Sequence, residues 1–147
     1  MTNEEILQKM EEDMKLRNFS KYSFYTYSHK AAEMMKYFNK PMEEVTTEEM
    51  RNYLLKLKEE KHLANRTVNY YNSILRFMYE VTLDKVLNKK QIPMLKGKRK
   101  ICKVLTKEEL SAFFNVCDDP KYKMIFMLIY GSGLRIGETA NLRIKDI

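Results

Sequence analysis

The sequence predicts an all-α protein, and three observations lead to this prediction. Helix-favouring residues are abundant, among them 11 methionines, while only 4 glycines and 3 prolines interrupt the chain. Apolar residues recur every three or four positions over several segments, which is the spacing of one helix face. Thr-x-x-Glu capping boxes at Thr2, Thr46 and Thr106 mark three helix starts. The 147 residues are enough for one domain or two small ones.

Four amphipathic helices are predicted within residues 1–84. The first two capping boxes open the first and third helices, and Ser20 can cap the second. Pro41 ends the second helix, because proline disfavours helical geometry in the residue before it. The predicted helices lie at about 2–16, 20–38, 46–57 and 66–81. Short connections between four amphipathic helices favour a compact helical bundle.

The net charge of +7 is concentrated in the second part of the sequence. Residues 1–84 carry 13 basic and 14 acidic residues, whereas residues 85–147 carry 14 basic and 6 acidic ones. Between Lys85 and Lys107 there are nine basic side chains and no acid. Helical periodicity also lapses over residues 85–105, so this segment is predicted to be an extended basic linker. Such a run can be an ordinary solvated surface, but polyanions are natural partners, because neutralised phosphates release counterions.

Further helices are predicted over residues 106–147. The third capping box opens one helix, and Asp118-Asp119-Pro120 forms a turn that places proline at the first position of the next. By periodicity alone, the apolar run from Met124 to Tyr130 suits either a buried strand or a buried helix. The residues before this run favour a helix. One more helix is predicted from Ile136 to about Ile144.

The segment that carries chemistry is Tyr130-Gly-Ser-Gly-Leu-Arg-Ile-Gly-Glu138. The apolar run ends at a glycine turn, Arg135 stands where a helix would begin, and Glu138 follows one turn later. The glycine spacing does not fit a dinucleotide-binding loop, and too few residues follow for its βαβ unit. The segment resembles the first catalytic-arginine motif of the tyrosine recombinases, the phage-integrase family. The preceding order of four helices, basic linker and capped helix extends this resemblance over essentially the whole chain.

This resemblance implies a two-domain DNA clamp. Residues 1–84 resemble the helical core-binding, SAM-like domain, and residues 106–147 resemble the beginning of the catalytic domain. In that family a tyrosine attacks a DNA phosphodiester and forms a 3′-phosphotyrosyl link, which a 5′-hydroxyl later reverses without a cofactor. Arg135 matches an arginine that stabilises the phosphate oxygens, for which a planar and permanently charged guanidinium is suited. Glu138 is expected either to orient Arg135 or to be a surface carboxylate.

The family's remaining catalytic residues have no match in these 147 residues. They are a hairpin lysine, a His-x-x-Arg motif, a later His or Trp, and the nucleophilic tyrosine. We therefore expect this portion to be inactive alone, either as a piece cut from a longer recombinase or as a natural truncation. Double-stranded DNA is the expected partner, self-association on DNA is expected of the full-length enzyme, and no metal or cofactor is expected.

Contacts with DNA are predicted on the helix faces opposite the apolar stripes. On the second helix this face presents Tyr22, Tyr25, Thr26, His29 and Lys36. On the fourth helix it presents Arg66, Asn69, Ser73 and Arg76, which suit bases and phosphates in a groove. In the linker, Lys98, Arg99 and Lys100 are predicted to follow the phosphate backbone. Each helix face can instead be an ordinary solvated surface.

Other features of the sequence indicate a cytoplasmic protein. No apolar run approaches the roughly 18–20 residues that span a bilayer, and the start Met-Thr-Asn-Glu-Glu is unlike a signal peptide. Cys102 and Cys117 lack metal-ligand spacing and are predicted to be free thiols. Two alternatives stay open: a non-catalytic helical protein that occupies recombination sites or pairs with an intact recombinase, and a helical protein–protein module with an incidental basic linker.

Overall fold

The computed structural model describes residues 1–97 and 102–146. The chain divides into two compact units, Met1–Arg99 and Lys100–Ile147. The described residues form helices and connecting segments with no β-strand among them, which confirms the all-α fold class. None of the helices in these ranges is long and apolar enough to cross a membrane.

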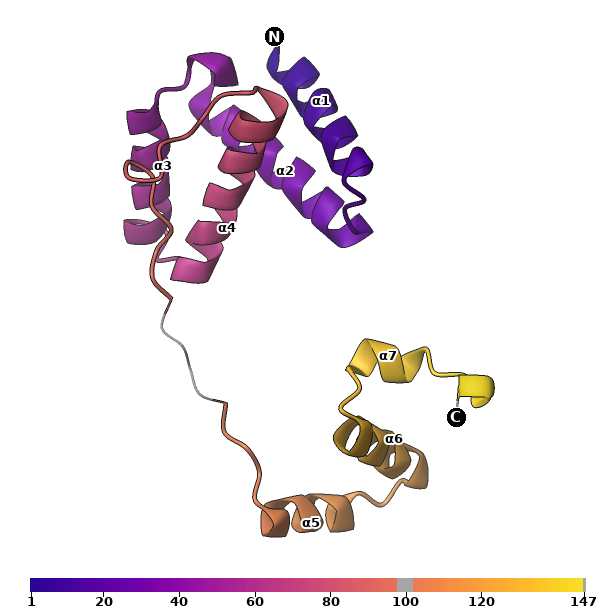
Figure 1. The fold of residues 1–147 in the computed structure, drawn as a ribbon. Coiled ribbons are helices and arrows are strands. Elements are labelled where there is room, and N and C mark those ends of the chain that lie inside the picture. Colours follow the sequence, from indigo (N-terminus) through magenta and orange to yellow (C-terminus); the bar gives the residue numbers. More distant parts are fainter. Residues whose placement is uncertain (98–101, 147) are drawn as a thin grey trace. The chain divides into compact units, whose positions relative to one another are not determined.

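The first unit contains four main helices and two short ones (Figure 1). The main helices are α1 (Asn3–Leu16), α2 (Lys21–Phe38), α3 (Thr47–Glu59) and α4 (Asn65–Arg76). The short ones are the 3-10 helix η1 (Met42–Glu44) and the π-helix η2 (Phe77–Thr82), which continues α4. The predicted starts are confirmed, because Thr2 and Thr46 form capping boxes and Ser20 accepts a hydrogen bond from the Ser23 amide. Asn39 ends α2 in the left-handed conformation, with a φ of 49°.

Methionines supply much of the core of this unit. Met10, Met34 and Met78 are fully buried and come from α1, α2 and η2, so the apolar stripes of these elements meet in one cluster. Burial of one such side chain contributes about 1.5–3 kcal/mol. Flexible thioethers fill irregular gaps well, which suits helices that cross at different angles.

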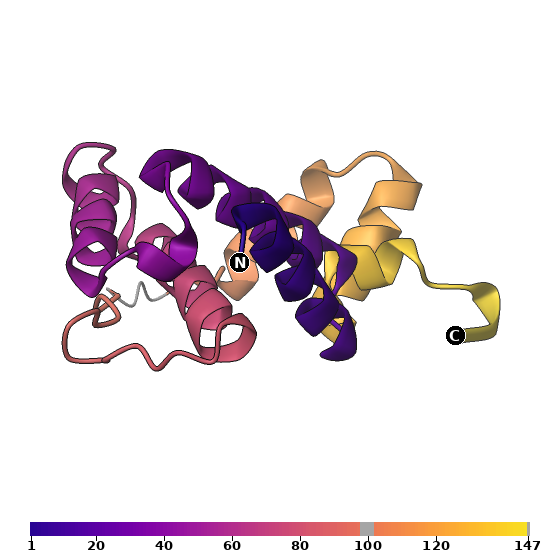
Figure 2. The ribbon, with the colours of Figure 1, turned by 90° about the horizontal axis from the view of Figure 1, so that it is seen from above.

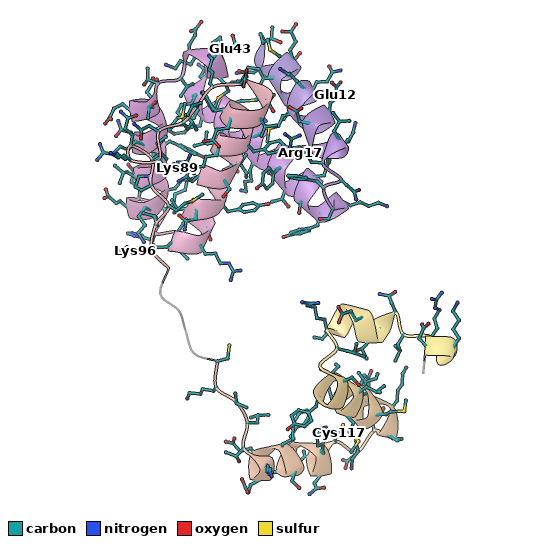
Figure 3. The ribbon with its side chains drawn as sticks, viewed as in Figure 1. Glu12, Arg17, Glu43, Lys89, Lys96 and Cys117 are labelled. Atoms are coloured by element: carbon teal, nitrogen blue, oxygen red, sulfur yellow. The ribbon has the colours of Figure 1, made fainter. Side chains whose placement is uncertain are left out.

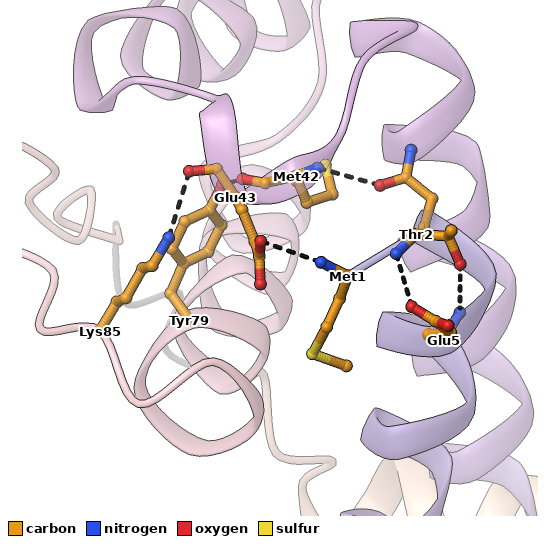
Figure 4. Close-up of polar contacts among 8 residues, drawn as sticks. Met1, Thr2, Glu5, Met42, Glu43, Tyr79 and Lys85 are labelled. Atoms are coloured by element: carbon orange, nitrogen blue, oxygen red, sulfur yellow. Dashed lines mark hydrogen bonds and ion pairs between the residues drawn. The ribbon is translucent and has the colours of Figure 1, made fainter.

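Polar contacts tie the chain start to the end of η2 (Figure 4). The Met1 ammonium lies 3.1 Å from a carboxylate oxygen of Glu43. The Lys85 ammonium donates to the Glu43 carbonyl at 3.2 Å, and the Tyr79 hydroxyl donates to the Met42 carbonyl. Burial raises the pKa of Tyr79, so its hydroxyl keeps the proton that it donates. η1 is thereby held between α1 and η2.

Residues 85–97, here named the strap, pack against α3 and α4 rather than forming a free linker. Leu87 and Ile92 belong to the buried core, and Leu95 packs against it. Figures 1 and 2 show the strap leaving the end of η2 and running back past α3 and α4. The prediction of an extended linker over residues 85–105 is therefore wrong for this part, and the first unit extends beyond residue 84. The physical reason is the apolar area of these three side chains, which is removed from water.

The second unit consists of α5 (Lys107–Val116), α6 (Pro120–Ser132), α7 (Ile136–Ala140) and the 3-10 helix η3 (Ile144–Asp146). The capping box at Thr106 is confirmed, as is the helical interpretation of Met124–Tyr130, which lies within α6. Gly133 ends α6 with a φ of 65°, a conformation that glycine adopts without strain. The next helix is shorter than predicted and ends at Ala140. The described side chains of α5–α7 include none that is buried, in contrast to the burial predicted for Met124–Tyr130.

Candidate nucleic-acid interface and catalytic arginine

The first turns of α2 and α4 border a surface hollow of about 360 Å³. In Figure 1 both helices start at the lower end of the first unit. The hollow is lined by Tyr22, Ser23, Thr26, Arg66, Thr67 and Tyr70. It therefore joins residues of the two helices on which the sequence predicted DNA contacts.

An aromatic cluster backs this hollow and holds α2 against α4. The ring of Tyr27 meets that of Tyr70 edge-on, with centroids 5.5 Å apart. Tyr27 also meets Phe77 at 5.9 Å and Phe19 at 5.4 Å. Burial, followed by the proximity of Tyr70, raises the pKa of Tyr27. Edge-to-face pairs add about 0.5–1.5 kcal/mol each beyond their buried area, so the two helix starts are fixed relative to each other.

The predicted DNA-contact side chains that are exposed are Tyr22, Tyr25, His29, Lys36 and Arg66. Tyr25 is 69% exposed, and both His29 and Arg66 are exposed. The rings of Tyr25 and His29 stack with centroids 6.0 Å apart. The two rings therefore offer stacking groups on α2, and Arg66 offers a permanent positive charge on α4.

The local electrostatics favour an anion at this end of the unit. α4 contains no acidic residue, and the one acid of α2 is Glu33. Glu33 is ion-paired with Lys30 at 2.7 Å, and this hydrogen bond lowers the pKa of Glu33. The N-cap of α4 is Ala64, whose side chain has no oxygen to accept from the first-turn amides. A helix start of this kind attracts phosphate through its dipole and its free N–H groups.

Of the other members of the predicted stripe on α4, Asn69 and Arg76 bind the strap and Ser73 bonds within the helix. The Asn69 side chain donates to the Leu95 carbonyl at 2.9 Å and accepts from the Leu95 amide at 2.7 Å. Ser73 donates to the Asn69 carbonyl at 2.9 Å. Arg76 donates to the Ile92 carbonyl at 2.7 Å. Asn69, Ser73 and Arg76 lie opposite the apolar stripe, as predicted, but protein backbone already occupies their hydrogen-bonding groups.

Sequence reasoning missed Asn65 and Asn72, which also hold the strap. Asn72 donates to the Pro93 carbonyl at 3.2 Å, and Asn65 donates to the Lys96 carbonyl at 2.8 Å. The sequence contained one signal for this packing, namely the isolated apolar residues in the segment that was predicted to be a linker. Figure 3 shows Lys96 at the end of the first unit where α4 begins. Lys98, Arg99 and Lys100, the predicted backbone contacts, lie outside the described residues.

In the second unit, Arg135 directly precedes α7 and is held by Glu138. The guanidinium donates to Glu138 at 2.9 Å, and the Arg135 amide donates to the other carboxylate oxygen at 2.7 Å. The Arg135 side chain is 86% exposed, so the pair adds little to stability. A guanidinium has five N–H donors, and this carboxylate leaves several of them directed to solvent. Glu138 therefore contacts Arg135, and its role in orienting a catalytic arginine stays a prediction.

Within the described ranges, no group of three or more His, Cys, Asp or Glu side chains is arranged to hold a metal ion. Cys102 and Cys117 are free thiols.

Comparisons with known proteins agree with the helical fold and with the resemblance to recombinases. y4qK of Sinorhizobium fredii, which carries an integrase/recombinase name, is 31% identical over 141 residues, covering 95% of this chain and 46% of y4qK. Tyrosine recombinase XerA of Pyrococcus horikoshii is 27% identical over 151 residues, covering 100% of this chain and 50% of XerA. The chain thus spans about half the length of these relatives.

A solved structure and a family description complete the comparison. The crystal structure of a XerA recombinase matches 99% of this chain and 51% of its own with a TM-score of 0.56 and 21% identity, a likeness of fold. Residues 6–89 match the phage integrase N-terminal SAM-like domain. The chain therefore belongs to the tyrosine recombinase, or phage integrase, family.

Proposed function

We propose that this chain is the DNA-binding N-terminal portion of a site-specific tyrosine recombinase, which cuts and rejoins DNA through a 3′-phosphotyrosyl intermediate. The observation that carries the proposal is the hollow between the first turns of α2 and α4. It combines exposed Arg66 with two helix starts that have no acid in their first turns. Membership of the recombinase family supports duplex DNA as the polyanion.

In the proposed complex a backbone phosphate lies against Arg66 and the first amides of α4. Tyr25 and His29 flank that contact from α2. The basic residues that follow the strap bind further phosphates, which adds affinity and salt sensitivity rather than sequence choice. Arg66 is the exposed member of the predicted α4 stripe, whereas Asn69, Ser73 and Arg76 are partly buried.

Arg135 has the catalytic role in this proposal. Attack on the phosphodiester places additional negative charge on the non-bridging oxygens, and a guanidinium can donate to two of them at once. Glu138 holds the arginine at the start of α7, where it lies 2.9 Å from the guanidinium. Removal of one such donor typically costs about 10²–10³ in rate.

The test is binding of this chain to random-sequence duplex DNA across a salt series. We expect measurable binding that weakens steeply with salt, and Arg66→Ala should lower the affinity and reduce the salt slope by about one. Arg51→Ala is the matched control, because Arg51 is an exposed arginine on α3 that pairs with Glu48. Equal losses in both variants would refute the hollow as the contact site. Absence of binding by the unaltered chain at low salt would refute the proposed function for this portion.

A further inference from the structure

Four polar side chains of α4 form a ladder that holds the strap along one face of the helix. Their spacing of four, three and four residues places them in one row. Successive rungs reach successively earlier strap residues, so the strap runs antiparallel to α4. The four rungs, defined here as the ladder, are Asn65 to Lys96, Asn69 to Leu95, Asn72 to Pro93 and Arg76 to Ile92, at 2.8, 2.9, 3.2 and 2.7 Å.

The last part of the strap depends on this ladder. Its first part has backbone hydrogen bonds of its own, from Lys85 to Tyr79 and from Ile92 to Asn88. Among the described residues, the backbone from Pro93 to Lys96 bonds only to side chains of the ladder. Beneath the strap, apolar contact is incomplete, because a cavity of about 210 Å³ lies between strap, α3 and α4. The side-chain bonds therefore fix the register.

The position of Lys96 decides where the basic residues that follow it in sequence are attached to the first unit. The strap ends at Lys96 beside Asn65, next in sequence to Arg66. The four residues from Pro93 to Lys96 span up to about 13 Å when extended, so loss of the ladder would let Lys96 move away from the hollow by a distance of this order. A tethered basic segment loses effective concentration at a site when its attachment point is no longer fixed.

We propose that Asn65, Asn69, Asn72 and Arg76 are positioning residues that hold Lys96, to which the basic residues 98–100 are joined in sequence, beside the Arg66 hollow. The proposal rests on the proposed function. In it, Asn69 acts on DNA binding through the strap and makes no contact with DNA. The ladder thereby fixes the point at which the basic residues that follow Lys96 in sequence are tethered to the first unit.

The test uses Asn69→Ala in the full chain, with hydrogen exchange at the Leu95 amide as the first measurement. That amide donates to the Asn69 carboxamide at 2.7 Å, and loss of both Asn69 bonds should speed its exchange about 10- to 100-fold. Asn52→Ala is the matched control, because Asn52 is an exposed asparagine of α3 with no side-chain hydrogen bond among the described residues. Asn65→Ala is the second variant, which should release Lys96 if Asn69→Ala disturbs the fold.

The second measurement is affinity for random-sequence duplex DNA in a double-mutant cycle. Asn69→Ala should weaken binding several-fold in the unaltered chain and have no further effect when Lys98, Arg99 and Lys100 are all alanine. Additive losses would mean that Asn69 itself contacts DNA, and this would overturn the proposal. Unchanged Leu95 exchange, or unchanged affinity despite faster exchange, would overturn it as well. If the unaltered chain binds no DNA, the proposed function and this role fall together, while Leu95 exchange still reports whether the ladder holds the strap.

Discussion

Replacement of Arg76 by alanine separates two roles that its position on α4 permits. As a base-reading residue, Arg76 would be dispensable for folding. In the structure its guanidinium donates to the Ile92 carbonyl at 2.7 Å, to Glu80 at 2.9 Å and to the Leu87 carbonyl at 3.4 Å. We therefore expect Arg76→Ala to lower the free energy of unfolding.

The size of the loss follows from burial and from the quality of each contact. The Arg76 side chain is 12% exposed. Water therefore has little access to the groups that Arg76 contacts and would replace few of the hydrogen bonds lost in Arg76→Ala. A hydrogen bond from a charged donor contributes about 1.5–3 kcal/mol, and the short bond to Ile92 qualifies for this range. The Glu80 pair along the helix adds about 0.3–0.5 kcal/mol, and the long bond to Leu87 adds little. The expected loss is about 2–4 kcal/mol, or a fall in Tm of about 10 °C or more.

Urea denaturation followed by far-UV circular dichroism measures this loss, provided the dependence on urea keeps its slope. Arg66→Ala is the control, because an exposed arginine should change stability by no more than about 0.5 kcal/mol. Arg76→Lys should recover part of the loss, since an ammonium keeps the charge but cannot reach two carbonyls at once. A loss below about 0.5 kcal/mol for Arg76→Ala would refute its role in holding the strap.

Two further predictions concern pH and catalysis. The hydrogen bonds from Lys40 and then Thr46 lower the pKa of Glu49 from 4.5 to about 2, so its contribution to stability is present above pH 4.5 and is lost as the pH falls toward 2. Glu49→Gln should remove this part of the acid-induced fall in Tm, whereas Glu44→Gln should keep it, and thermal melts between pH 2 and 6 distinguish them. The proposed function predicts that, in a recombinase that contains this portion, Arg135→Ala abolishes strand cleavage while DNA binding is largely kept. Near-normal cleavage of a suicide DNA substrate would remove Arg135 from the active site.

The fold was predictable where its signals are local. A capping box needs two side chains three residues apart, and the boxes at Thr2, Thr46 and Thr106 all form as expected. The turn before α6 needs Asp119 as N-cap and Pro120 in the first turn, and both are there. Such signals depend on backbone geometry within one turn, so distant parts of the chain do not alter them.

The strap was not predictable in the same way, because its order comes from tertiary contacts. Leu87, Ile92 and Leu95 follow no helical or strand period, and polar residues separate them, so periodicity assigned the segment to a linker. Their burial depends on the surface that α3 and α4 present together. A local sequence pattern contains no information about that surface. The same limit applies to the exposure of α6, whose apolar run by itself predicts burial.

The candidate DNA surface shows why a helix face is an incomplete guide to function. A row of asparagine and arginine side chains can read base edges or hold a backbone segment, because both tasks need the same donors and acceptors. The angle around the helix therefore does not separate Arg66 from Arg76; the neighbouring chain does. The strap reaches the first turn of α4 at Lys96, where Asn65 holds its carbonyl. Arg66 stays exposed because it lies beside α2 at the hollow, so the proposed DNA surface is the part of α4 that the strap does not cover.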